Sequence, residues 1–465
     1  MPLRQIRSHA FRTEAAALWR LAWPMLVGQL AAVGMAVVDV AMSGHASAFD
    51  LAGVSLGASV WSIILVTLMG LMMSVNPTVA HLVGAGEYGK IGHVVRQALW
   101  KGVGVGLLAL LAALLFAEVF DHMQIEPEVR RVAKGFVRIT AFALPAFACF
   151  RVLYGYSASL GKTKPMMLIS LAALALNGLL NSLLVFGNLG FPALGGLGCA
   201  VASLACVWLN LLAMLWWMRH EPAYRKAWPF DRFEGPHWPE LANLLHIGLP
   251  IGVTYFAEAS AFGLIALLVA KFGATQVAAH QIALNFSSLV FMLPMSLGTA
   301  LITRVGLALG EGNPQAARYR AWVGVGLGLG FALLSASFIA VFRQQIAAAY
   351  TNDAAVAALA AQLLIFAALF QLSDATQVTT SCAIRGYKVT RPPMVIHMAA
   401  FWGFSLPLGC ALGLAPDWLP LRPEQPMAAK GFWIALVVGL TVAALGLTGL
   451  LHRLSRKRLP ARLPA

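Results

Sequence analysis

Three carboxylic acids lie in the middle of long apolar runs of this chain, at Asp39, Glu258 and Asp374. A charged side chain at the centre of a bilayer costs about 2.5–3.5 kcal/mol on insertion scales, so each acid needs a partner or a function. A low dielectric disfavours the charged form of a carboxyl group. Such a group can take up a proton on one side of a membrane and release it on the other, or hold a desolvated cation with nearby oxygen atoms. We predict that the three acids bind a coupling ion, Na+ or H+, and attract a positively charged substrate.

A structural role is the alternative for each of these acids. An ion pair or a hydrogen bond between helices also satisfies a buried carboxylate. Arg151 is the only basic residue that we expect at a comparable depth, and one arginine does not neutralise three acids. The other acidic residues fall in tails, in loops or at the ends of apolar runs, as Glu118 does.

Polar neighbours of the acids have less certain roles. Asn177 and Asn181 are four residues apart and therefore share one face of a helix. They either complete an oxygen site with Asp39 or join two helices through hydrogen bonds. His280 and Gln281 lie early in an apolar run, where a hydrogen bond between helices is favoured over a proton relay.

No enzymatic or cofactor site emerges from the motifs. The chain contains no HExxH, GxSxG or paired Cys/His pattern, and we expect no catalytic residue and no cofactor. The stretch from Leu160 to Thr163 resembles the end of a phosphate-binding loop but lacks the glycine four residues before its Gly-Lys pair. The five cysteines have no metal-ligand spacing, and lie in apolar stretches: Cys149, Cys199, Cys206, Cys382 and Cys410.

The composition is that of a membrane protein. Hydrophobic residues make up 60% of the chain and charged residues 11%, against about 25% charged in soluble domains. This excludes a soluble enzyme, a disordered protein and a secreted disulfide scaffold. The net charge of +15 is spread thinly between apolar runs, so we expect a lipid bilayer as partner and no nucleic acid.

Twelve runs are long enough to span a bilayer as helices, because a span needs about 20 mainly apolar residues. Alternating strands of the barrel type are absent, so we predict an all-α integral membrane protein. The predicted spans are 18–43, 51–83, 98–118, 132–158, 166–187, 198–218, 241–270, 277–308, 321–343, 356–384, 394–415 and 431–451.

Basic residues predict the orientation. Of the 33 Lys and Arg residues, 24 lie in the tails or near the connections between spans on one side of the membrane, and 8 lie on the other side. Cytoplasmic loops carry the excess of positive charge, so both termini are expected in the cytoplasm.

The sequence repeats itself after about 226 residues. Pro24 aligns with Pro250 and Gly86 with Gly312, while Thr163-Lys164-Pro165 aligns with Thr390-Arg391-Pro392 at an offset of 227. Each proline removes a backbone donor from its helix, which predicts a kink. Six helices per repeat give two lobes, residues 1–225 and 226–465, of like orientation about an axis along the membrane normal. This arrangement is typical of carriers that alternate between two openings.

Three stretches resemble the multidrug and toxic compound extrusion (MATE) family, in its NorM-like branch. They are DVAMSGHASAFDLAGVSLGASVW from Asp39, FAEASAFGLIALLVAKFGATQVAAHQIALNFSSLVFMLPMSLG around Glu258 and QLSDATQVTTSCAIRGYKVTRPPM around Asp374. The resemblance implies efflux of organic cations driven by Na+ or H+. It places Asp39 in a site of the first lobe near Asn177 and Asn181, and the other two acids in a cation site of the second lobe.

One position departs from that family pattern. NorM-like proteins often have tyrosine four residues before the acid of the tenth helix, where this chain has Phe370. The substitution removes a hydroxyl that could serve as ligand or donor, which weakens the prediction of a sodium site of that detailed form.

These observations predict a monomeric antiporter that exports amphipathic organic cations, such as drugs and dyes, by alternating access. The side chains of Phe286, Met292 and Met295 either face its cavity or pack inside the helix bundle. The alternative function is a lipid-linked oligosaccharide flippase of related fold. A flippase needs basic residues for a pyrophosphate group, whereas the deep charges here are mainly acidic.

Overall fold

The computed structural model describes residues 3–415 and 423–457, with side chains from residue 9 onward, and all regular secondary structure in those residues is helical. Eleven helices in this part of the chain are long and apolar enough to cross a membrane, or twelve if one bent pair counts as a single span. The bent pair replaces the predicted span 132–158, and its two helices meet at 49°. The chain is therefore a multi-pass membrane protein with about the predicted number of spans.

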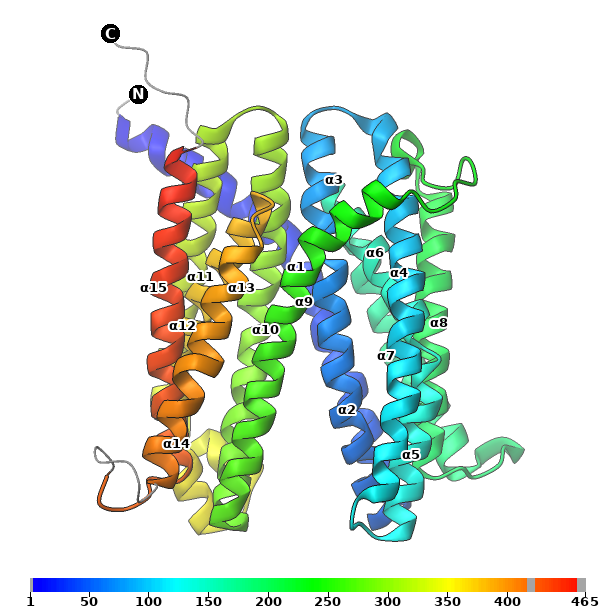
Figure 1. Ribbon diagram of the computed structural model, residues 1–465, viewed down its shortest axis with the longest axis vertical. Coiled ribbons are helices and arrows are strands. Elements are labelled where there is room, and N and C mark those ends of the chain that lie inside the picture. The colour runs from blue at the N-terminus through cyan, green and yellow to red at the C-terminus, as the bar shows by residue number, and fades with distance from the viewer. Residues whose placement is uncertain (1–2, 416–422, 458–465) are drawn as a thin grey trace. The chain divides into compact units, whose positions relative to one another are not determined.

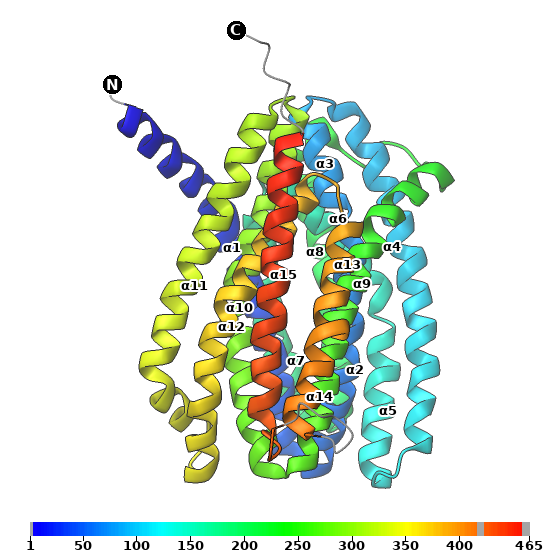
Figure 2. The same cartoon turned by 60° about the vertical axis from the view of Figure 1, so that its left-hand side comes forward.

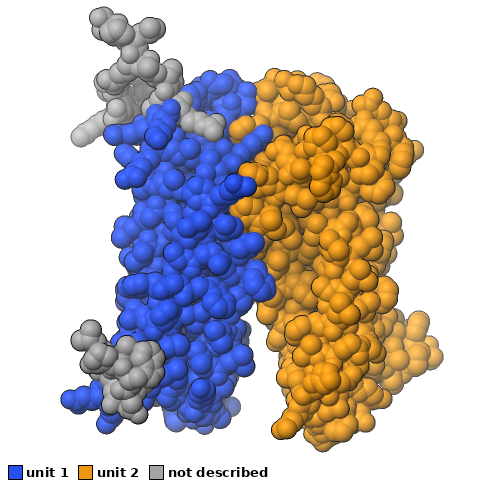
Figure 3. All heavy atoms as spheres, viewed as in Figure 1, with its two compact units in different colours: residues 1–22, 253–465 blue, residues 23–252 orange. Residues whose placement is uncertain are grey.

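The chain divides into two compact units, which Figure 3 colours separately: residues 23–252 form the N-terminal unit, and residues 1–22 with 253–465 form the C-terminal unit. The chain passes between the units inside two continuous helices, α1 (Leu3–Ala46) and α9 (Trp238–Val269). Pro24 and Pro250 lie inside these helices, each two residues from the point of passage.

The remaining elements follow in chain order (Figures 1 and 2). The N-terminal unit holds α2 (Ala48–Met72), α3 (Val75–Gly84), α4 (Tyr88–Ala117), η1 (Glu118–His122), α5 (Pro127–Ala141), α6 (Leu144–Ser159), α7 (Lys164–Phe186), η2 (Asn188–Gly190), α8 (Gly196–His220) and η3 (Pro222–Ala227). The C-terminal unit holds η4 (Ala270–Phe272), α10 (Ala274–Gly310), α11 (Pro314–Tyr350), α12 (Ala354–Gly386), α13 (Arg391–Met398), the π-helical η5 (Ala399–Ser405), α14 (Leu406–Leu414) and α15 (Ala429–Lys457).

Helix α12 is the central element of the C-terminal unit. It packs against α10, α11 and α15, and both ribbon views show it beside α11 and α15. Buried residues recur all along it, including the polar residues Gln377, Thr379, Thr380 and Ser381. A helix surrounded by other helices holds its polar side chains away from lipid, which is where a membrane protein places ionisable groups.

Corresponding helices of the two sequence repeats end in the same way. Gly86 and Gly312 have φ of +72° and +70°, a left-handed conformation that glycine adopts without steric cost. The next residue in each case donates to the carbonyl five positions earlier, Glu87 to Leu82 and Asn313 to Ala308, both at 2.9 Å. This pattern is that of a Schellman helix end. The glycines aligned by sequence thus have a shared backbone function.

The predicted span 51–83 is interrupted between α2 and α3, and a buried lysine occupies the break. Lys101 of α4 is 4% exposed, and its Nζ donates to Leu71 O at 2.9 Å and to Ser74 Oγ at 2.6 Å. A break in a helix leaves carbonyl groups without their intrahelical donors, and the ammonium group supplies one. Lys101 therefore has a structural role besides its contribution to the basic side of the molecule.

The connection between the two repeats is hydrogen-bonded to α4 through Pro229, Asp231 and Glu234. The Arg96 guanidinium donates to Pro229 O at 2.8 Å, to Glu234 Oε1 at 3.0 Å and to Asp231, and it is 7% exposed as a residue. His93 also lies 2.7 Å from Glu234. The hydrogen bonds from Arg96 and His93 lower the pKa of Glu234 to about 2. The connection is thus held by ionic hydrogen bonds to the N-terminal unit.

Substitution of Gly106 should destabilise the protein, whereas substitution of its neighbour Gly104 should not. A Cβ at Gly106 would lie 2.6 Å from Pro145 Cα of α6, but a Cβ at Gly104 would meet no described heavy atom within 4 Å. Overpacking of this kind costs about 1–3 kcal/mol. Gly106→Leu should therefore lower the thermal unfolding temperature in detergent, and Gly104→Leu should not. Equal effects of the two variants would contradict this account of α4–α6 packing.

Glu234→Gln should reduce stability in a way that depends on pH. A carboxylate with a lowered pKa contributes stability that is complete above its unfolded pKa, about 4.3, and is lost as pH falls towards its folded value. In thermal unfolding in detergent, the difference between wild type and Glu234→Gln should be constant from pH 7 to 5 and shrink by pH 3. Glu87→Gln, which removes an exposed pair with Lys90, is the control. A difference that stays the same at pH 3 contradicts the prediction.

Candidate functional site

Three uncharged donors surround Asp39 in the N-terminal unit. Asp39 lies on α1 and is 8% exposed. Asn177 and Asn181 of α7 donate to its Oδ1 at 3.1 and 2.6 Å, and Ser203 of α8 donates to Oδ2 at 2.7 Å. These dipoles stabilise a carboxylate without neutralising it.

The structure thus brings both asparagines to Asp39. Asn181 Oδ1 is itself a buried acceptor that receives no hydrogen bond in the described chain. A buried acceptor beside a carboxylate gains a partner when the acid is protonated or when a cation binds beside it. The sequence contains no signal for Ser203, which lies 164 residues after Asp39 on a different helix.

A cavity of about 290 Å³ adjoins Asp39 within the N-terminal unit. Aromatic side chains form much of its wall: Trp61, Phe136, Phe147, Phe150 and Tyr154. Arg151 also lines the cavity, with its guanidinium carbon 4.4 Å from the centroid of the Tyr154 ring. A carboxylate among aromatic faces provides both charge and π-surface for an organic cation.

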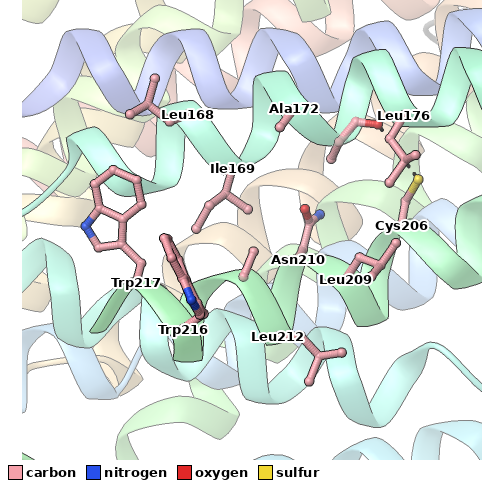
Figure 4. Close-up of a pocket in the computed structure, with 12 residues that line it drawn as sticks. Leu168, Ile169, Ala172, Leu176, Cys206, Leu209, Asn210, Leu212, Trp216 and Trp217 are labelled. Carbon is pink, nitrogen blue, oxygen red and sulfur yellow. Dashed lines mark hydrogen bonds between the residues drawn. The ribbon is translucent and has the colours of Figure 1, made fainter. Parts of the chain in front are cut away.

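A second, larger hollow lies between α7 and α8 and is almost entirely apolar. Its volume is about 560 Å³, and Figure 4 shows Trp216 and Trp217 at one end and Cys206 at the other. Asn210 projects between them and, with Cys206, also lines the cavity beside Asp39. The hollow holds no ionisable carboxylate, so it is not the site that the three acids predicted.

Glu258 and Asp374 form the acidic site of the C-terminal unit. They lie on α9 and α12, close enough for their charges to act on each other. Asp374 is 3% exposed and accepts a hydrogen bond from Gln377 Nε2 at 3.1 Å. Glu258 is partly exposed. Two carboxylates at short range favour a shared proton or cation between them.

A buried arginine adjoins this acid pair. Arg385, in the last turn of α12, is 3% exposed, and its charge acts on Glu258. Its Nη1 donates to Tyr255 Oη at 3.2 Å. The expectation that Arg151 is the only deep basic residue is therefore wrong. Arg385 follows the predicted span 356–384 directly, and a basic residue near a helix end looks the same in sequence whether it reaches water or folds inward.

The π-helical segment positions one wall of the site. Trp402, within η5, donates from Nε1 to Ala257 O at 3.0 Å, on the residue before Glu258. Met295 accepts a hydrogen bond from Tyr255 at 3.4 Å and is buried, so it packs inside the unit. Local π-helical turns are frequent at functional sites because the extra residue redirects side chains.

His280 and Gln281 point to different surroundings. His280 is fully buried, and its Nδ1 accepts from Trp433 Nε1 at 3.1 Å, which is the expected bond between helices. Gln281 is exposed and is not brought to the acids. Phe370 packs edge-on to Trp433, with ring centroids 5.8 Å apart. That face of α12 is therefore aromatic and presents no oxygen ligand.

Glu14 shows what a neutralised acid looks like in the same structure. It is 7% exposed, and Arg304 Nε donates to its Oε1 at 2.8 Å while Nη2 bonds the other oxygen. A two-pronged guanidinium contact satisfies a carboxylate fully. Asp39 and Asp374 have amide or hydroxyl donors instead, so the structural alternative of a direct ion pair applies to Glu14 rather than to them. In the described chain, no three His, Cys, Asp or Glu side chains cluster as metal ligands.

Known proteins match this chain over nearly its whole length. The MatE family model matches residues 24–183 and 250–410, two stretches that begin 226 residues apart. Multidrug resistance protein PmpM of Pseudomonas aeruginosa is 42% identical over 452 residues, covering 97% of this chain and 94% of that protein. The probable multidrug resistance protein NorM of Chromobacterium violaceum is 42% identical and covers 96% and 95%. A crystal structure of the eukaryotic MATE transporter AtDTX14 shares the fold, with a TM-score of 0.86 at 20% identity and coverage of 96% and 98%.

Removal of the Asn181 donor should destabilise the protein through Asp39. Asn181→Leu leaves a buried carboxylate with one donor fewer, which costs about 1–3 kcal/mol in the free energy of unfolding. The cost should be smaller in an Asp39→Asn background, because no charge is then left to stabilise. Thermal unfolding in detergent of the two single variants and the double variant measures this coupling. Asn210→Leu is the control. Additive effects of Asn181→Leu and Asp39→Asn would contradict the assignment of Asn181 as a donor that stabilises the Asp39 carboxylate.

Proposed function

Because this chain belongs to the MATE family of transporters, we propose that it is a multidrug efflux antiporter that exchanges amphipathic organic cations for Na+ or H+. Membership confirms the resemblance seen in the sequence, and it makes the chain a transporter rather than an enzyme. The observation that carries the coupling is the acid pair of Glu258 and Asp374, whose charges act on each other inside one unit.

The ion site of this proposal is the C-terminal acid pair. A proton or Na+ held between Glu258 and Asp374 relieves the repulsion of two carboxylates in a low dielectric. Arg385 lowers the affinity of the acid pair for this cation, because its positive charge acts on Glu258. Opposition of this kind makes binding weak enough to reverse, and a carrier must release its ion on the far side of the membrane.

The cavity of the N-terminal unit supports binding of the drug. Its carboxylate, Asp39, attracts a cationic group, and its aromatic wall provides the apolar surface for an amphipathic molecule. The volume of about 290 Å³ suits a small planar ring system. The amides of Asn177 and Asn181 donate to Asp39 and so favour its ionised form while a cation is bound.

The repeat supports alternating access. We place one lobe at residues 1–225 and the other at residues 226–465, related by a pseudo-two-fold axis along the membrane normal. The excess of basic residues orients both termini to the cytoplasm of a bacterial inner membrane. Pro24 and Pro250, near the passages of the chain between units, are the positions at which α1 and α9 bend during transport. We propose a monomer, since each chain carries both acid sites.

Purified protein in liposomes should expel a cationic dye only when a sodium or a proton gradient is imposed. The two gradients are supplied separately, and the one that drives efflux identifies the ion. Glu258→Gln and Asp374→Asn should each abolish gradient-driven efflux, with a loss of at least about tenfold, because an amide neither binds a proton nor neutralises a cation.

Glu128→Gln is the matched control, because Glu128 forms an exposed pair with Arg131 and should leave efflux unchanged. Efflux that survives both site variants contradicts the coupling mechanism. If neither gradient moves any organic cation, the antiporter assignment is wrong. Movement of a fluorescent lipid-linked oligosaccharide by the same liposomes would instead favour a flippase.

A further inference from the structure

A hollow of about 220 Å³ lies between α4 and the connection between the two repeats, residues 228–237, within the N-terminal unit. Helix α4 contributes Trp100 and Val103 to its wall, and the connection contributes Phe230 and Phe233. Phe233 is 88% exposed, and its ring meets that of Trp100 edge-on, with centroids 6.2 Å apart. The wall is therefore largely apolar and aromatic, and part of it is open to the surroundings of the protein.

A row of exposed apolar side chains continues from this hollow along α4. Trp100 lies near the start of the predicted span 98–118, and tryptophan is enriched where a span meets the membrane interface. Leucines at helical spacing follow it on the same side of the helix. They are 48–74% exposed: Leu107, Leu108, Leu111 and Leu115. In a membrane this face contacts acyl chains, so the hollow lies at the end of a lipid-facing surface.

The polar groups at the hollow have charges of both signs. Arg232 lies in its wall, with Nε 2.6 Å from Glu234 Oε1. Arg96 lines it from α4 and pairs with Asp231 and Glu234. Two guanidinium groups and two carboxylates balance each other, so these four residues provide no excess of charge that would select a pure anion or a pure cation.

Two of these four residues keep hydrogen-bonding capacity towards a ligand. The side chain of Arg232 is 66% exposed, and the contact of its Nε with Glu234 leaves the N–H groups of both Nη atoms. The side chain of Asp231 is 59% exposed, and its Oδ1 accepts from Arg96, which leaves Oδ2. Asp231 directly precedes Arg232 in the chain. A ligand with one anionic and one cationic group matches this pair of side chains.

We propose that this hollow binds a phospholipid with an ethanolamine head group. The phosphate accepts hydrogen bonds from the Nη groups of Arg232, because a guanidinium fork matches the geometry of phosphate oxygens. The ammonium group donates to Asp231, and an acyl chain follows the leucine row of α4. The apolar wall and this row identify the ligand as a membrane lipid rather than a soluble phosphate ester.

The inference goes beyond the proposed function, because it concerns neither the acids of the ion site nor the transported drug. The lipid belongs to the leaflet on the side of the connection between the two repeats, which is the cytoplasmic leaflet in the orientation proposed above. A bound lipid would join α4 to the connection, and these two segments already share the hydrogen bonds of Arg96.

The test is native mass spectrometry of the delipidated full-length protein in detergent, with added lipids of identical acyl chains. Phosphatidylethanolamine should form a saturable adduct. Phosphatidylcholine, whose N-methyl groups replace the N–H donors, should bind about tenfold more weakly, a difference of about 1.4 kcal/mol. Glycerophosphoethanolamine, the head group without acyl chains, should not displace the lipid at equal concentration, because it lacks the apolar part.

Variants assign the two ends of the head group. Arg232→Gln should weaken binding of phosphatidylethanolamine and of phosphatidylglycerol, since both carry the phosphate. Asp231→Asn should weaken phosphatidylethanolamine about tenfold without weakening phosphatidylglycerol, which has no ammonium group. Arg225→Gln is the matched control, because Arg225 is exposed, precedes the same connection and lies outside the hollow. Thermal unfolding without lipid verifies that each variant is folded.

Three results would overturn the proposal. The first is equal affinity of the wild type for phosphatidylethanolamine and phosphatidylcholine, or a preference that survives both site variants. The second is tighter binding of phosphatidylglycerol than of phosphatidylethanolamine, which indicates a site for net negative charge. The third is displacement of the lipid by glycerophosphoethanolamine at equal concentration, which indicates a soluble ligand. The measurement needs no gradient and no drug, so its failure is separable from failure of the antiport experiment.

Discussion

The free-energy cost of a charge in a low-dielectric interior is the constraint on which the rest of this structure depends. The protein meets it in three ways. Glu14 is neutralised by Arg304, Asp39 is stabilised by amides and a hydroxyl, and Glu258 lies within range of a second acid, Asp374. Only the first arrangement is complete in itself. The other two leave a carboxylate that a proton or a cation can still stabilise, and they are the two that suit transport.

The helices that carry these acids are also the ones that connect the units. The chain passes from one unit to the other within α1 and α9, and these same helices bear Asp39 and Glu258. A change of charge at either acid therefore alters the forces on a continuous helix that belongs to both units. Asp374 lies instead on α12, the central helix of its unit, where Gln377, Arg385 and the π-helical segment hold the site together.

In the function proposed above, separate sites for drug and ion are compatible with coupled exchange. Two ligands that prefer different states of one protein each reduce the affinity for the other, by the same factor in both directions. Such coupling does not require that they share a carboxylate. It requires that each acid be stabilised differently in the two states, and in the proposed function the incomplete neutralisation of Asp39 and of the C-terminal pair would provide that sensitivity.

The sequence by itself determined the class of the protein, its approximate spans, its repeat and its three deep acids, because hydropathy, charge distribution and helical spacing are local properties. It also placed Asn177 and Asn181 on one face, which the structure confirms. Ser203, Gln377 and Arg385 are brought to the acids only by the tertiary structure. Most of them reach the acids across helices, and a contact between helices leaves no periodic pattern in the chain. Burial of Arg385 and Lys101 was likewise decided by packing, since a basic residue near a helix end turns outward or inward according to which neighbouring helix offers it acceptors.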